Sequence, residues 1–154
     1  MSKIETIYLI AHTHTDIGYT DHQNTLFRQQ MDFIDRAVDL GEATADYPPE
    51  AQYKWTCEVA AMAERYLRQR PAAQVDRFLK LHRAGRIAVA AMAYHWTPLL
   101  SPAAMVRSLY PVMRLRREFG LTITSAMQCD VDGASWLWPT CCRLSVSHRL
   151  HHVH

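Results

Sequence analysis

The sequence lacks both a long apolar run and an excess of charge of either sign. Its 154 residues carry a formal net charge of +2, and Lys and Arg do not gather in one block, so nucleic acid is not an indicated partner. No apolar run approaches the roughly eighteen residues of a membrane span. The amino-terminal segment lacks the basic start and the small-residue cleavage site of a signal peptide. We therefore expect a cytoplasmic protein with no membrane partner.

Cysteines are few and are poorly spaced for disulfides. Cys57 and Cys129 lie far apart in apolar surroundings, which is typical of reduced core residues. Cys141 and Cys142 are adjacent, an awkward arrangement for a disulfide framework. The apolar fraction of 49% and the charged fraction of 21% are those of an ordinary globular protein with one modest core.

Short apolar runs alternate with helical patterns along the chain. The predicted strands are residues 4–11, 53–57, 86–92 and 121–128. The predicted helices are residues 25–40, which Gly41 ends, 58–70, a helix from Pro71 to Gly85, and 101–119, which Gly120 ends. Helical crossovers between buried strands predict an α/β fold with a parallel sheet. Four strands make an open sheet or roughly half of a (β/α) barrel.

A histidine-rich motif follows the first predicted strand. If the backbone stays extended there, His12, His14 and Asp16 share one face, because residues two apart point the same way. Imidazole and carboxylate together suit a divalent metal such as zinc. A hydrogen-bonded loop histidine is the plainer alternative.

An acidic motif, Asp130-Val131-Asp132-Gly133, follows the fourth predicted strand. The carboxyl ends of parallel strands gather on one rim, where active sites are found. Asp130 is therefore expected to join His14 and Asp16 in a charged pocket. Asp132 is better explained as a turn former before Gly133.

These two motifs resemble those of glycoside hydrolase family 38, the retaining α-mannosidases. Residues 12–19 resemble the signature H-x-H-x-D-x-G-[WY], and residues 128–135 resemble Q-x-D-x-x-G-x-S. The resemblance covers residues 4 to about 138. It implies that His14, Asp16 and Asp130 hold Zn²⁺ or another divalent cation, and that Asp130 is also the catalytic nucleophile.

The resemblance also implies substrate contacts and a mechanism. Tyr19 stands where the family usually has a tryptophan beside the sugar, and His12 supports the site without coordinating. Retaining hydrolysis of an α-mannoside needs a second carboxyl group about 5 Å from the nucleophile. In the family, that acid/base residue and a further zinc histidine belong to a later part of the domain that nothing in this sequence matches. We therefore expect the chain to be inactive by itself.

Two aromatic segments near strand ends have less specific interpretations. Glu58, after Trp55, could face the pocket, but a carboxylate at a helix start, where negative charge is favourable, is the preferred interpretation. Trp96, after Tyr94-His95, is a weak candidate for sugar stacking, with packing as the alternative. A metal-dependent carbohydrate deacetylase and a non-catalytic truncated gene product remain as alternative functions.

The sequence divides into residues 1–139, the amino-terminal portion of the catalytic barrel, and a non-matching tail, 140–154. Four of the nine histidines fall in the last seven positions, without the spacing of a structural zinc site. We interpret the tail as a chain end outside the fold, such as the product of a reading-frame slip near Thr140. A disordered natural tail is the alternative.

Overall fold

A computed structural model describes residues 3–145 as helices packed on a small parallel sheet. The strands β1 (Trp55–Cys57), β2 (Ile87–Ala91) and β3 (Ser125–Ala126) lie in the order β1-β2-β3. Trp55 pairs with Ile87, and Ala90 pairs with Ser125. The parallel α/β arrangement is as predicted. Each strand is shorter than its apolar run.

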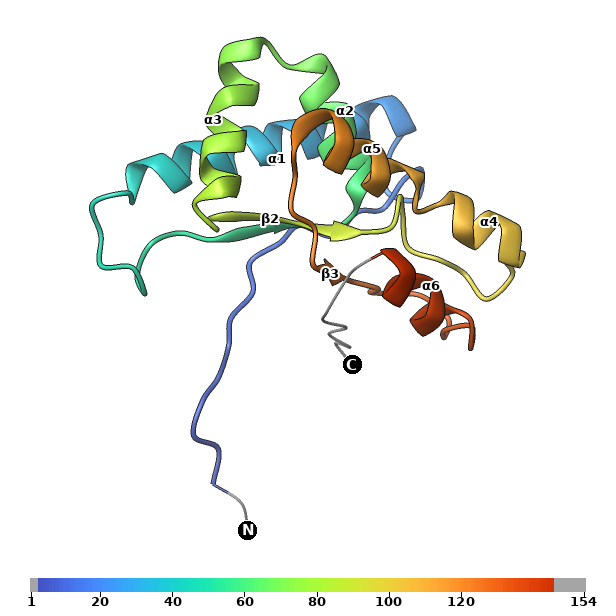
Figure 1. Cartoon of the computed structure of the whole chain (residues 1–154). Coiled ribbons are helices and arrows are strands. Elements are labelled where there is room, and N and C mark those ends of the chain that lie inside the picture. Colours follow the sequence, from blue (N-terminus) through green and yellow to red (C-terminus); the bar gives the residue numbers. More distant parts are fainter. Residues whose placement is uncertain (1–2, 146–154) are drawn as a thin grey trace.

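Helices connect the strands and cover the sheet. Figure 1 shows α1, α2, α3 and α5 gathered on one side of it. The helices are α1 (Gln23–Ala43), α2 (Ala60–Gln69), α3 (Ala72–Arg83), α4 (Pro102–Arg107), α5 (Tyr110–Phe119) and α6 (Trp138–Ser145). Their apolar faces meet the sheet in one core that contains Ile34, Tyr66 and Phe78. None of the helices in residues 3–145 is both long and apolar enough to span a bilayer.

The first predicted strand, residues 4–11, does not form. The backbone N–H of Thr56 donates to the carbonyl of Ala11 (2.9 Å), and one parallel bridge joins His12 to Thr56. The chain before this bridge runs away from the body of the molecule (Figure 1) and exposes Ile7 by 76% and Leu9 by 93%. Because β1 is only three residues long, it offers partners to the end of the segment alone.

Two differences from the predicted helices have a clear physical cause. Gly41 does not end α1: it lies inside the helix, where an added Cβ would come within 2.8 Å of Leu81. The single helix predicted over residues 101–119 is two helices, α4 and α5. Pro111 lies in the first turn of α5, where its missing N–H is tolerated, whereas inside a continuous helix it would remove a hydrogen bond. Gly120 ends α5 as predicted, with a left-handed φ of 68°.

The predicted tail begins inside α6. Pro139 lies in its first turn, and Cys141 and Cys142 are buried in the core. Residues 140–145 are therefore part of the folded body, because the two adjacent cysteines supply an apolar face. The histidine cluster lies beyond, outside the described residues.

Candidate functional site

Three chain segments meet at the carboxyl edge of the sheet. The first motif follows the His12–Thr56 bridge, Glu58 follows β1 directly, and Asp130 follows β3. The strands are parallel, so these residues leave them on the same edge. Residues far apart in the sequence are thereby brought together.

His14, Asp16 and Asp130 converge, as predicted. His14 Nε2 lies 3.2 Å from Asp16 Oδ1 and 3.5 Å from Asp130 Oδ2. One ligand atom from each of the three residues lies within 4.8 Å of the other two. The Asp130 side chain is 79% exposed, so its carboxylate is accessible from solvent. Asp130 has a φ of 51°, a left-handed conformation that aspartate tolerates better than most residues.

The charge around His14 favours a cation. Burial lowers the pKa of His14, but the hydrogen bond and negative charge of Glu58 and the charges of Asp16 and Asp130 outweigh it, so the pKa is raised. An ordinary histidine has a pKa of about 6.5. The same surroundings that attract a second proton to Nε2 would attract a metal ion.

Glu58 is not the helix-start carboxylate that the sequence suggested. Helix α2 begins at Ala60, and no side chain caps its amino terminus. The Glu58 side chain is fully buried, with Oε1 3.2 Å from His14 Nδ1 and 3.6 Å from His12 Nδ1. Burial raises the pKa of Glu58, but the close approach of His95 and the hydrogen bond and charge of His14 outweigh burial, so the net shift is downward.

His95 is a site residue that sequence reasoning missed. Its Nε2 lies 3.2 Å from Glu58 Oε1, and its ring stacks on that of His14 with centroids 5.8 Å apart. The available signal was its position after β2, on the same sheet edge as the two motifs. Its neighbour Trp96, the candidate named from the sequence, is only 3% exposed. This burial in the core favours packing, the alternative that the sequence left open for Trp96, and its role in sugar stacking stays a prediction.

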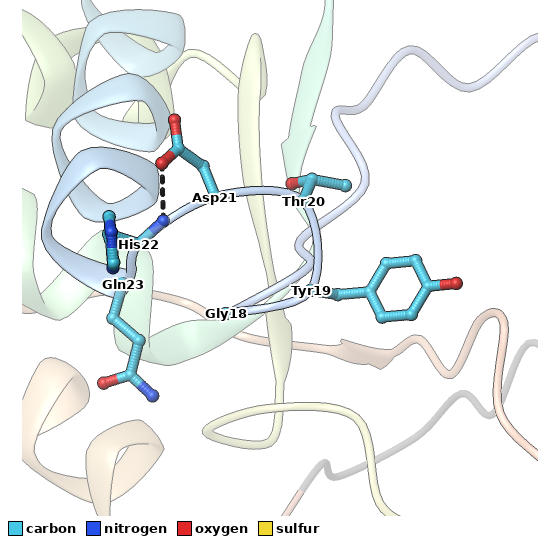
Figure 2. A pocket seen from close by; sticks show the side chains of 6 residues that line it. All are labelled: Gly18, Tyr19, Thr20, Asp21, His22 and Gln23. Carbon is cyan, nitrogen blue, oxygen red and sulfur yellow. Dashed lines mark hydrogen bonds between the residues drawn. The ribbon is translucent and has the colours of Figure 1, made fainter.

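Tyr19 lies on the loop between the first motif and α1. Its side chain is 90% exposed and points away from the loop (Figure 2). The loop lines an open hollow of about 430 Å³ made by residues 18–23, and none of the three converging residues lines it. The structure shows no contact between Tyr19 and those residues that would identify it as a sugar platform.

His12 and Asp132 lie close to their expected places. His12 Nδ1 lies 3.6 Å from Glu58 Oε1, but His12 does not belong to the converging set of His14, Asp16 and Asp130. Asp132 is exposed in the turn where Gly133 N–H donates to the Val131 carbonyl (2.8 Å). Asp132 is thus placed as a turn residue.

The family comparison covers nearly the whole chain. The model described as the glycosyl hydrolases family 38 N-terminal domain matches residues 5–152. This range includes most of residues 140–154, which were predicted to be a non-matching tail. No curated protein matches the chain.

Proposed function

Because the chain belongs to glycoside hydrolase family 38, we propose that it carries the cation-binding and nucleophilic groups of a metal-dependent retaining α-mannosidase with a (β/α) barrel. The observation that carries the proposal is the convergence of His14 Nε2 with the carboxylates of Asp16 and Asp130. The α-mannoside substrate follows from the family resemblance of the two motifs.

The three donors fit a zinc ion. Zinc binds imidazole nitrogen and carboxylate oxygen at about 2.0–2.2 Å, so two tetrahedral ligand atoms lie about 3.3–3.6 Å apart. The distances from His14 Nε2 to Asp16 and Asp130 are 3.2 and 3.5 Å. A divalent cation bound here supplies a positive charge that holds sugar hydroxyls and stabilises the charge that develops during glycoside cleavage.

Asp130 is the nucleophile in this proposal. Its exposed carboxylate attacks the anomeric carbon, the bond from that carbon to the departing oxygen breaks, and a glycosyl ester forms on Asp130. Water then cleaves the ester and restores the carboxylate. Asp16 takes no part in bond formation and stays beside His14 through both steps.

Protonation of the departing oxygen is the step that the described residues do not provide. Among the acids at the site within residues 3–145, Asp16 and Asp130 are cation ligands in this proposal. Glu58 is buried and does not reach solvent or substrate. We therefore expect the isolated chain to be inactive toward ordinary mannosides. A leaving group that departs without a proton bypasses this requirement.

The test uses 2,4-dinitrophenyl α-D-mannoside, whose phenolate leaves unprotonated. With Zn²⁺ present, we expect one equivalent of dinitrophenolate per chain and a hexose adduct on the peptide that contains Asp130, measured by mass spectrometry. Asp130→Asn should abolish the adduct, and EDTA should suppress it. Asp132→Asn is the matched control, because its side chain lies in the neighbouring turn and should leave the adduct unchanged. An adduct that persists in Asp130→Asn would disprove the assignment.

A further inference from the structure

We propose that Glu58 is a positioning residue, which holds His14 in the tautomer whose Nε2 lone pair faces Asp16 and Asp130. The inference rests on the proposed function, because it takes His14 Nε2 as the ligand atom. Glu58 lies outside the two motifs, residues 12–19 and 128–135, on which the family resemblance rests. The proposal comes from the hydrogen bonds around its buried carboxylate.

Both oxygens of Glu58 are occupied from inside the protein. Oε2 accepts the backbone N–H of Thr15 (2.7 Å), and Oε1 accepts from His14 Nδ1 (3.2 Å). A buried carboxylate is costly unless donors surround it. Because an ionised carboxylate only accepts hydrogen bonds, the hydrogen in the His14 contact must lie on Nδ1.

This contact fixes the other nitrogen of His14. A neutral imidazole carries one hydrogen, so with Nδ1 protonated the Nε2 atom presents its lone pair. That lone pair faces the carboxylates of Asp16 and Asp130. Such a carboxylate–histidine–metal relay is a common way to orient a metal ligand.

Contacts from Gln30 and His95 fix the backbone and the ring of His14. Its carbonyl accepts a hydrogen bond from Gln30 Nε2 of α1 (2.9 Å), and the His95 ring stacks on its own at an interplanar angle of 12°. Gln30 of α1 thus anchors the main chain of His14, and the His95 ring lies nearly parallel to the His14 ring. The hydrogen bond to Glu58 then decides which ring nitrogen of His14 faces Asp16 and Asp130.

His95 also shows why the inner cluster is not the metal site. His14, Glu58 and His95 also bring three ligand atoms within 4.8 Å. The N–H of Cys129, however, donates to His95 Nδ1 (3.4 Å), so in the neutral ring the hydrogen is on Nε2. Nε2 then faces Glu58 as an N–H group, although without hydrogen-bond geometry, and has no lone pair for a metal. The inner cluster is a support for the outer one.

The first test measures the tautomer of His14 in the metal-free full chain. Long-range ¹H–¹⁵N NMR at about pH 9, well above the ordinary histidine pKa of about 6.5, should show the Nδ1–H form. In Glu58→Gln the amide offers both a donor and an acceptor, so a mixture of tautomers is expected. A merely structural role for Glu58 would leave the tautomer unchanged.

The second test measures Zn²⁺ affinity by competition with a chromophoric chelator. Loss of such an orienting partner lowers metal affinity by about 10–100-fold, and this is the expected change for Glu58→Gln. Glu58→Asp, which keeps a carboxylate, should recover part of the affinity. Glu64→Gln is the matched control: Glu64 is also largely buried and acidic, but it pairs with Arg114 away from the site and should leave the affinity unchanged.

The outcomes separate this inference from the proposed function. An Nε2–H tautomer in the unmodified chain overturns the inference, even if Glu58→Gln fails to fold. Glu58→Gln with unchanged tautomer and unchanged Zn²⁺ affinity also overturns it. If the Nδ1–H form and the affinity loss are both found but no mannosyl adduct forms on Asp130, the inference stands and the glycosidase mechanism alone fails.

Discussion

His82, away from the site, is a histidine whose two ring nitrogens have fixed and opposite roles. Nδ1 donates to the carbonyl of Ile87 (2.9 Å), and Nε2 accepts the backbone N–H of Thr122 (3.0 Å). Burial lowers the pKa of His82, although the bond to Ile87 acts in the opposite direction. Protonation would place a hydrogen on Nε2 and break the contact with Thr122, so the folded protein favours the neutral ring.

His82 should therefore make the protein less stable in mild acid. Between the unfolded pKa of about 6.5 and the lower folded value, the unfolded chain binds more protons, so the free energy of unfolding falls as the pH falls. Urea unfolding from about pH 7.5 to about pH 5 should show a smaller loss for His82→Gln than for the unmodified chain. His22→Gln, at an exposed histidine, should retain the full loss. Equal losses in all three proteins would contradict the assignment.

Among the elements, α1 and α3 approach closely at Gly41. A Cβ there would meet Leu81 Cδ1 at 2.8 Å, and Leu81 is buried. Alanine gains up to about 1 kcal/mol over glycine in helix propensity, but overpacking costs about 1–3 kcal/mol. We expect Gly41→Ala to lower the free energy of unfolding by about 1 kcal/mol in urea titrations.

A double-mutant cycle checks the cause of this loss. Leu81→Val removes both Cδ atoms, which the new Cβ would meet at 2.8 and 3.2 Å, so Gly41→Ala should be neutral or stabilising in that background. If Gly41→Ala destabilises both backgrounds equally, the close approach to Leu81 is not the reason.

The elements also show how far sequence reasoning extends. The parallel order and the convergence of His14 with Asp130 were predictable, because apolar runs and strand-end motifs are local signals. Gly41 was misread as a helix end because the partner that requires a glycine, Leu81, is invisible in the local pattern. The position of Glu58 in the pocket was only the second choice for a similar reason: its three histidine neighbours come from other segments.

The prediction of a strand over residues 4–11 was wrong for another reason. Its composition favours a buried strand, but burial depends on neighbours that the segment itself does not encode. Only the last residues of the segment reach β1, so the pairing stops at the bridge between His12 and Thr56. Intrinsic preference was overruled by tertiary context.

For the molecule as a whole, the main liability is the apolar surface of this segment. Exposed apolar side chains on an unpaired, extended chain favour self-association. Replacing Ile7 and Leu9 with lysine should change the free energy of unfolding by no more than about 0.5 kcal/mol, as for ordinary surface positions, while light scattering falls. Ile34→Lys, in the core, is the contrasting variant and should unfold the protein. A large destabilisation by the two surface lysines would show that the segment is packed after all.

The hydrogen bond from the Thr15 amide to Glu58 makes one backbone proton a monitor of the whole assembly. Thr15 is buried, and its acceptor also contacts His14 and His95. Exchange of this amide with deuterated solvent requires the loop to open, which leaves a charged oxygen without its donor. The exchange rate of that single proton therefore reports how often three segments separate: the one after the His12–Thr56 bridge, the one after β1 and the one after β2. The measurement needs no fluorescent or enzymatic label.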